Sequence, residues 1–105
     1  MDVKEKIRQM VTAHPVVLFM KGTPQQPMCG FSANALQVLA ACGVKDVHGV
    51  NVLEDAEIRQ GIKEYAKWPT IPQLYVQGEF VGGSDIMIEM YQSGELQKLL
   101  AGENV

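Results

Sequence analysis

One unbroken apolar run, Val16-Val17-Leu18-Phe19-Met20, marks the centre of the fold. Five consecutive apolar residues predict a strand that is buried on both faces, as in sheets that are covered by helices on either side. Before Pro15, residues 3–13 carry apolar side chains at helical spacing, which predicts a short amphipathic helix. The first two predicted elements are therefore a helix and a central strand.

The next segment, residues 21–32 (KGTPQQPMCGFS), reads as an irregular loop that ends in a cysteine at the start of a helix. Apolar residues at helical spacing predict that helix from residue 31 to about residue 41, and Gly43 predicts its end. A weaker strand is expected at 47–52. Because a helix connects the two strands, they are expected to be parallel.

The second half of the chain predicts a hairpin between helices. Asp55 is placed to cap a helix. Residues 73–76 and 79–81 flank a Gln-Gly turn and predict an antiparallel hairpin. Further helices are expected over 86–92 and after Gly94. This order predicts an α/β, thioredoxin-like fold, with a four-stranded mixed sheet flanked by helices on both faces.

Composition restricts the class of protein. The chain has 105 residues, of which 47% are hydrophobic and 20% charged, so residues 1–105 are expected to form one globular domain. The net charge is −3 with no basic stripe, which argues against nucleic acid as a partner. No apolar run approaches the length of a membrane span, so no membrane association is expected.

The two cysteines, Cys29 and Cys42, are too few for a disulfide framework. If one helix runs between them, they lie roughly 20 Å apart, whereas a disulfide needs Cα atoms within about 7 Å. No disulfide within the chain is expected, which favours a reducing compartment. The mixed charges of the N-terminus do not resemble a signal peptide. We therefore expect a bacterial cytoplasm or an organelle matrix rather than secretion.

Cys29 is the expected centre of the chemistry. A thiol acts as nucleophile or metal ligand in its thiolate form, and a helix N-terminus lowers the pKa of the thiol by offering unpaired N–H groups. Lys21, at the other end of the loop, would add a positive charge. Ser32 occupies the fourth position of the Cys29-Gly30-Phe31-Ser32 motif and cannot resolve a mixed disulfide. Cys29 is therefore expected to share its sulfur with an external thiol or a metal; a small buried apolar cysteine is the alternative.

Two further segments are expected near this cysteine. Thr70-Ile71-Pro72 precedes a strand, and a cis-proline there would leave the preceding backbone free to pair with an extended peptide; an ordinary strand-edge proline is the alternative. Gly82-Gly83-Ser84-Asp85 offers N–H groups that suit a carboxylate and an aspartate that suits an amine; a plain turn and N-cap is the alternative. Arg59 and Lys63 lie one helical turn apart, which alone indicates a solvated helix face.

Together these motifs make the chain resemble a monothiol glutaredoxin of the CGFS type. The resemblance runs from about residue 7 to about residue 100. It rests on four segments in family-like order and spacing: Lys21-Gly22-Thr23-Pro24, Cys29-Gly30-Phe31-Ser32, Trp68-Pro69-Thr70-Ile71-Pro72-Gln73 and Gly82-Gly83-Ser84-Asp85.

The resemblance implies glutathione as the ligand. Lys21 and Arg59 would hold its glycine carboxylate. The backbone of Ile71 would pair with its cysteinyl unit, and the segment 83–85 would hold its γ-glutamyl end. The residues implied in binding glutathione or a cofactor are Lys21, Cys29, Phe31, Arg59, Thr70, Ile71, Pro72, Gly83, Ser84 and Asp85.

The resemblance also implies a [2Fe–2S] cluster that bridges two protomers. Each protomer would give the Cys29 thiolate and one glutathione thiolate, and four thiolates suit this cluster type. Cys29 would thus be the metal ligand. The implied partners are a second copy of the chain when the cluster is bound, iron–sulfur acceptor proteins and a helper protein of the BolA type.

Three functions are compatible with these residues. The serine at position 32 and the long loop 21–29 favour a carrier that transfers the cluster to acceptor proteins. The alternative is an oxidoreductase that removes glutathione from protein thiols by a one-cysteine mechanism. An inert thioredoxin-like adaptor is a third hypothesis, and it leaves the residues around Cys29 unexplained.

Some residues depart from the family pattern or carry no expected role. Ser84 stands where many family members have cysteine, so the disulfide that some single-domain relatives are thought to form there is excluded. Cys42 is expected to pack in the core. His14 and His48 have no further ligand at suitable sequence spacing, so no zinc site is expected.

Overall fold

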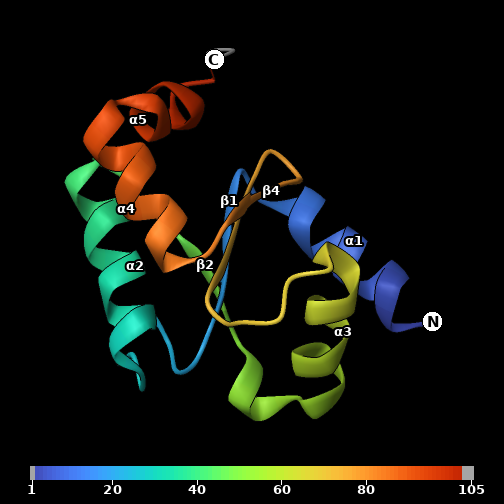
Figure 1. The fold of residues 1–105 in the computed structure, drawn as a ribbon. Helices are drawn as coiled ribbons and strands as arrows, with labels where there is room; N and C mark the ends of the chain where they lie inside the picture. The colour runs from blue at the N-terminus through green and yellow to red at the C-terminus, as the bar shows by residue number, and fades with distance from the viewer. Residues whose placement is uncertain (1, 103–105) are drawn as a thin grey trace.

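The computed structural model describes residues 2–102 (Figure 1). Ten elements follow one another along the chain: α1 (Val3–Ala13), β1 (Val16–Met20), α2 (Gly30–Ala41), β2 (His48–Asn51), a 3₁₀ turn η1 (Val52–Glu54), α3 (Ala56–Ala66), β3 (Gln73–Val76), β4 (Glu79–Gly82), α4 (Ser84–Ser93) and α5 (Glu95–Leu100). None of the helices in this part of the chain is both long and apolar enough to cross a membrane.

The four strands form one mixed sheet in the order β2-β1-β3-β4. β1 pairs in parallel with β2, and it pairs antiparallel with β3 on its other side. β3 and β4 form the expected antiparallel hairpin. The predicted central position of β1 is confirmed, because it has a strand on either side and all five of its residues are buried.

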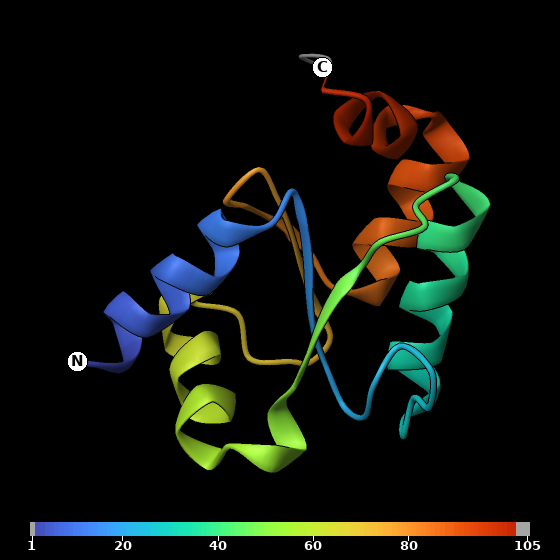
Figure 2. The ribbon, with the colours of Figure 1, turned by 180° about the vertical axis from the view of Figure 1, so that it is seen from behind.

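Helices cover both faces of the sheet. Val17 and Phe19 of β1 pack into a core with residues of α1 and α3. Val16, Leu18 and Met20 point the other way and pack into a second core with residues of α2, α4 and α5. The same two groups of helices stand on opposite sides of the strands in Figure 2. Alternation of side chains along one strand therefore builds two cores.

Side-chain caps begin two of the helices, α1 and α3. The carboxylate of Asp2 accepts a hydrogen bond from the N–H of Glu5 at 2.9 Å and caps α1. The carboxylate of Asp55 caps α3 as predicted, accepting from the N–H groups of Glu57 and Ile58. A capping carboxylate satisfies donors that have no partner inside the helix.

Several boundaries differ from the prediction by one or two residues, and two of them bear on the site. β2 ends at Asn51 rather than Val52, because the Asn51 side chain accepts the N–H of Leu53 and opens the turn η1. α4 begins at Ser84 rather than Ile86, with Gly83 as its N-cap residue. Ser84 and Asp85, which were expected to precede this helix, therefore lie in its first turn.

Candidate functional site

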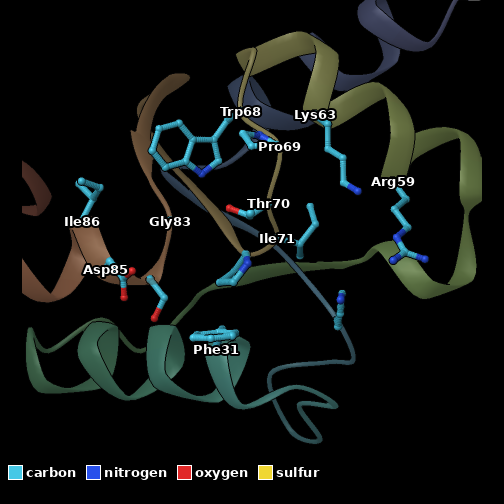
Figure 3. Close-up of a pocket in the computed structure, with 13 residues that line it drawn as sticks. Phe31, Arg59, Lys63, Trp68, Pro69, Thr70, Ile71, Gly83, Asp85 and Ile86 are labelled. Atoms are coloured by element: carbon cyan, nitrogen blue, oxygen red, sulfur yellow. The ribbon is translucent and has the colours of Figure 1, made fainter.

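A groove of about 380 Å³ opens between α2, α3, the loop before β3 and the start of α4 (Figure 3). This volume suits a small-molecule ligand. The residues that line it are Lys21, Phe31, Arg59, Lys63, Trp68, Pro69, Thr70, Ile71, Pro72, Gly83, Ser84, Asp85 and Ile86.

The two ends of the groove carry opposite charge. Arg59 and Lys63 project from α3 at one end, and Asp85 of α4 lies at the other (Figure 3). Lys21 also lines the groove. A ligand with a carboxylate at one end and an amine at the other matches this polarity.

The wall between the charged ends is held by the buried side chain of Gln73. Its amide nitrogen donates to the carbonyl oxygens of Trp68 at 3.0 Å and Thr70 at 3.3 Å. Its amide oxygen accepts from the Tyr75 hydroxyl at 3.2 Å. The Ile71–Pro72 peptide bond in this wall is cis, as predicted. Gln73 thus fixes the loop from the side away from the groove.

Buried polar groups in the groove remain without a partner. The indole N–H of Trp68 and the hydroxyl of Ser84 are both buried and make no hydrogen bond to the described residues. A Cβ atom built on Gly83 would lie 3.3 Å from both the Trp68 indole nitrogen and the Pro72 carbonyl oxygen. Because buried polar groups are normally satisfied, these groups indicate a site that takes a polar ligand.

The loop before Cys29 is more ordered than the sequence indicated. Thr23 and Gln26 exchange backbone hydrogen bonds, and the N–H of Met28 donates to the carbonyl of Lys21 at 2.9 Å. Gly22 and Pro27 form an isolated antiparallel bridge. The segment is a small closed hairpin, which fixes the start of α2 relative to the end of β1.

Ser32 is fully buried, and its hydroxyl oxygen accepts the N–H of Lys21 at 3.1 Å. The fourth residue of the Cys29-Gly30-Phe31-Ser32 motif therefore ties the helix to the far end of the loop. This contact leaves the hydroxyl proton of Ser32 free to be donated to the neighbouring thiolate.

Cys29 is the N-cap residue of α2 and is half-buried. Burial works against its thiolate, but the N–H groups of Ser32 and Phe31, the Ser32 hydroxyl and the charge of Lys21 together favour it. The net result is that the pKa of the Cys29 thiol lies below its ordinary value. The expected contributions of the helix N-terminus and of Lys21 are both present.

Comparison with known proteins identifies the family. The glutaredoxin family model matches residues 16–81. This chain belongs to the glutaredoxin family. A protein named as an uncharacterized monothiol glutaredoxin ycf64-like from Synechocystis sp. is 62% identical over 99 residues, which cover 94% of this chain and 92% of that protein.

Further relatives place this glutaredoxin in the monothiol branch. The mitochondrial monothiol glutaredoxin-5 of Schizosaccharomyces pombe is 56% identical over 94% of this chain and 69% of its own length. The solution structure of reduced apo GrxS14 from poplar superposes with a TM-score of 0.84 at 50% identity, covering 95% of this chain and 91% of that one. The predicted glutaredoxin fold is confirmed.

In this glutaredoxin, nine of the ten residues expected at the site line the groove: Lys21, Phe31, Arg59, Thr70, Ile71, Pro72, Gly83, Ser84 and Asp85. Cys29 is not among the lining residues and stands beside the groove, at the N-terminus of the helix that contributes Phe31. Met28 and Phe31 on either side of it are 67% and 61% exposed. Cys29 is therefore flanked by two exposed apolar side chains.

Sequence reasoning left Lys63, Trp68, Pro69 and Ile86 out of the expected site, yet all four line the groove. Lys63 carried a signal, because it lies one turn from Arg59 on the same helix. Trp68 packs against Phe80 with ring centroids 5.5 Å apart and also faces the groove.

The second cysteine and the histidines lie away from the groove. Cys42 is the C-cap residue of α2, at the opposite end of this helix from Cys29, and burial raises the pKa of its thiol. His14 and His48 stack with ring centroids 3.8 Å apart, a contact that sequence spacing did not indicate. Pairing of Val17 with His48 in the parallel strands brings them together.

Proposed function

We propose that this glutaredoxin binds glutathione in the groove and carries a [2Fe–2S] cluster, bridged between two protomers, to iron–sulfur acceptor proteins. The observation that carries the proposal is the combination of one activated cysteine with a buried serine at the fourth motif position. Ser32 carries a hydroxyl in place of a second thiol, and its oxygen accepts the Lys21 N–H, so the motif offers a single thiolate and needs further thiolates from outside.

The polarity of the groove supports glutathione as the source of one of them. The glycine carboxylate of the tripeptide would face Lys21 and Arg59, and its γ-glutamyl carboxylate would accept N–H groups at the start of α4. Its ammonium group would face Asp85. The cysteinyl unit between them would pair with the backbone of Ile71 and lie next to Cys29.

The cluster is the cargo of this proposal. Among residues 2–102, no group of three or more His, Cys, Asp or Glu side chains could hold a metal ion. One protomer would therefore supply only the Cys29 thiolate, and its bound glutathione a second. Two protomers with two glutathione molecules complete the four thiolates that a [2Fe–2S] cluster takes.

A second candidate function is supported by the lowered pKa of the Cys29 thiol. Its thiolate would attack the glutathione sulfur of a protein–glutathione mixed disulfide, and the protein thiolate would leave. A second glutathione thiolate would then attack the Cys29–glutathione disulfide, releasing oxidised glutathione and regenerating the Cys29 thiolate. The chain would act as an oxidoreductase with one cysteine.

Anaerobic reconstitution with iron, sulfide and glutathione separates the two functions. A carrier develops visible absorption and circular-dichroism bands that require glutathione, and its mass on gel filtration doubles. A colourless monomer that turns over a glutathione mixed disulfide would refute the carrier and leave the oxidoreductase. Cys29→Ser abolishes both activities and serves as the blank for either assay.

The names of relatives support the proposed location. The mitochondrial yeast relative and the bacterial relative support an organelle matrix or a bacterial cytoplasm as the location. A BolA-type helper protein is proposed as an alternative partner of the cluster-bound protomer. Mixing the loaded protein with an apo acceptor and following the visible spectrum tests cluster transfer.

A further inference from the structure

The carboxamide of Asn51 joins the end of β2 to the active-site loop. Its oxygen accepts the N–H of Gly22 at 3.0 Å and the N–H of Leu53 at 3.0 Å. Asn51 is also paired with Met20 across the parallel strands. One side-chain oxygen therefore connects the loop that follows β1 with the turn that follows β2.

Gly22 fills this position tightly. It is buried, its φ is +92°, and a Cβ atom there would lie 2.5 Å from the Gln26 carbonyl oxygen and 2.6 Å from the Met28 nitrogen. If the oxygen of Asn51 were removed, the Gly22 N–H would be left without this acceptor in a place that water reaches poorly. A buried donor without a partner is unfavourable, so the loop is expected to shift.

Lys21 is the residue whose placement depends on this contact. Its N–H donates to Ser32 and its carbonyl accepts from Met28, while the next peptide N–H is held by Asn51. These three contacts fix the backbone from which the Lys21 side chain enters the groove. Neither Asn51 nor Leu53 lines the groove. Any effect of Asn51 on a ligand in the groove must therefore pass through the backbone that carries Lys21.

We propose that Asn51 is a positioning residue that holds Gly22 and thereby directs the Lys21 ammonium group to the carboxylate end of the groove. This inference rests on the proposed glutathione site. Asn51→Ala weakens binding of reduced glutathione about fivefold, as expected when the contact between the Lys21 ammonium group and the glycine carboxylate is weakened by about 1 kcal/mol. Asn51→Asp keeps an oxygen acceptor at the same place and restores the affinity.

The test is a titration followed by amide NMR shifts under anaerobic, reducing conditions. Reduced glutathione and its glycine ethyl ester are added to the full chain, to Asn51→Ala, to Asn51→Asp, to Lys21→Met and to the double variant Lys21→Met/Asn51→Ala. The ester lacks the negative charge that Lys21 would meet, so Asn51→Ala leaves the affinity for the ester unchanged. The double variant binds glutathione about as weakly as Lys21→Met alone.

Independent effects would instead multiply, so the double variant would bind glutathione about fivefold more weakly than Lys21→Met alone, and that result overturns the proposal. An equal loss of affinity for glutathione and its ester also overturns it, because the effect then bypasses Lys21. Hydrogen exchange at the Gly22 amide is measured on the same samples. Unchanged exchange in Asn51→Ala refutes the contact itself, whether or not glutathione binds; absence of binding by the unsubstituted chain refutes the glutathione site.

Discussion

Replacing Gln73 by methionine tests how the wall of the groove is held. The two side chains have nearly the same volume, so the change removes polar contacts without opening a cavity. It leaves three groups without their partner: the carbonyls of Trp68 and Thr70 and the hydroxyl of Tyr75. Each buried polar group that loses its partner costs roughly 1–3 kcal/mol.

Only the Tyr75 hydroxyl is fully buried; the two carbonyl contacts are partly buried, and the longer one to Thr70, at 3.3 Å, contributes least. We therefore expect a loss of about 2–4 kcal/mol in the free energy of unfolding. That is a large share of the total stability of roughly 5–15 kcal/mol for a small domain. The assay is equilibrium unfolding in urea, followed by far-ultraviolet circular dichroism. Gln60→Met, the same substitution at an exposed position of α3, is the matched control.

Tyr75→Phe removes only one of the three contacts and is expected to cost about 1 kcal/mol. Combined with Gln73→Met, it adds less than it costs alone, because the hydroxyl has already lost its acceptor. If Gln73→Met unfolds within about 0.5 kcal/mol of Gln60→Met, the amide does not hold the wall and the reasoning fails.

Three further predictions concern the thiol, the histidines and the loop. Ser32→Ala removes a hydroxyl that favours the thiolate, so the pKa of Cys29 rises and alkylation of its thiol at neutral pH slows. Thiolate absorbance against pH measures this pKa, and an unchanged titration contradicts the prediction. Partial desolvation and the charge of the stacked His14 lower the pKa of His48, although part of its side chain is exposed. The unfolded state therefore binds more protons, and stability falls as pH drops below about 6.5. His48→Gln flattens this urea-unfolding profile, and an equally steep profile in the variant would be inconsistent with the assignment. A Cβ atom at Gly22 would lie 2.5 Å from a backbone oxygen, whereas a Cβ atom at Gly43 would meet nothing within 4 Å, although both glycines have positive φ. Gly22→Ala therefore lowers the free energy of unfolding by about 1–3 kcal/mol more than Gly43→Ala in the same assay. Equal losses in the two variants would refute the clash.

The elements with local signals were predicted well. The apolar run 16–20 identified the central strand, and the stripe in residues 3–13 gave α1 with its observed bounds. Asp55 was recognised as a cap because its signal lies within the first turn of the helix it opens. Nine of the ten expected site residues also line one groove, because these residues were assigned from motifs that the family places around its ligand site.

The features that were missed depend on contacts between distant segments. The hairpin within loop 21–28 is anchored by Asn51, which lies on another strand. The stacking of His14 on His48 follows from strand register, which single residues do not reveal. The indole N–H of Trp68 is buried without a hydrogen-bond partner because the fold places Gly83 beside it, and the sequence does not show this contact. Periodicity reports which face of an element is buried, but not which partner it meets.

The hydrogen bond between Ser32 and the Lys21 backbone has a consequence for how such proteins diverge. A cysteine at position 32 would exchange a compact hydroxyl acceptor for a larger and weaker sulfur one. The Lys21 N–H would then have a weaker acceptor in the same step that supplied a second thiol. The residue type at position 32 and the path of the loop before Cys29 are therefore linked. A change from one-thiol to two-thiol chemistry at this site would have to alter both.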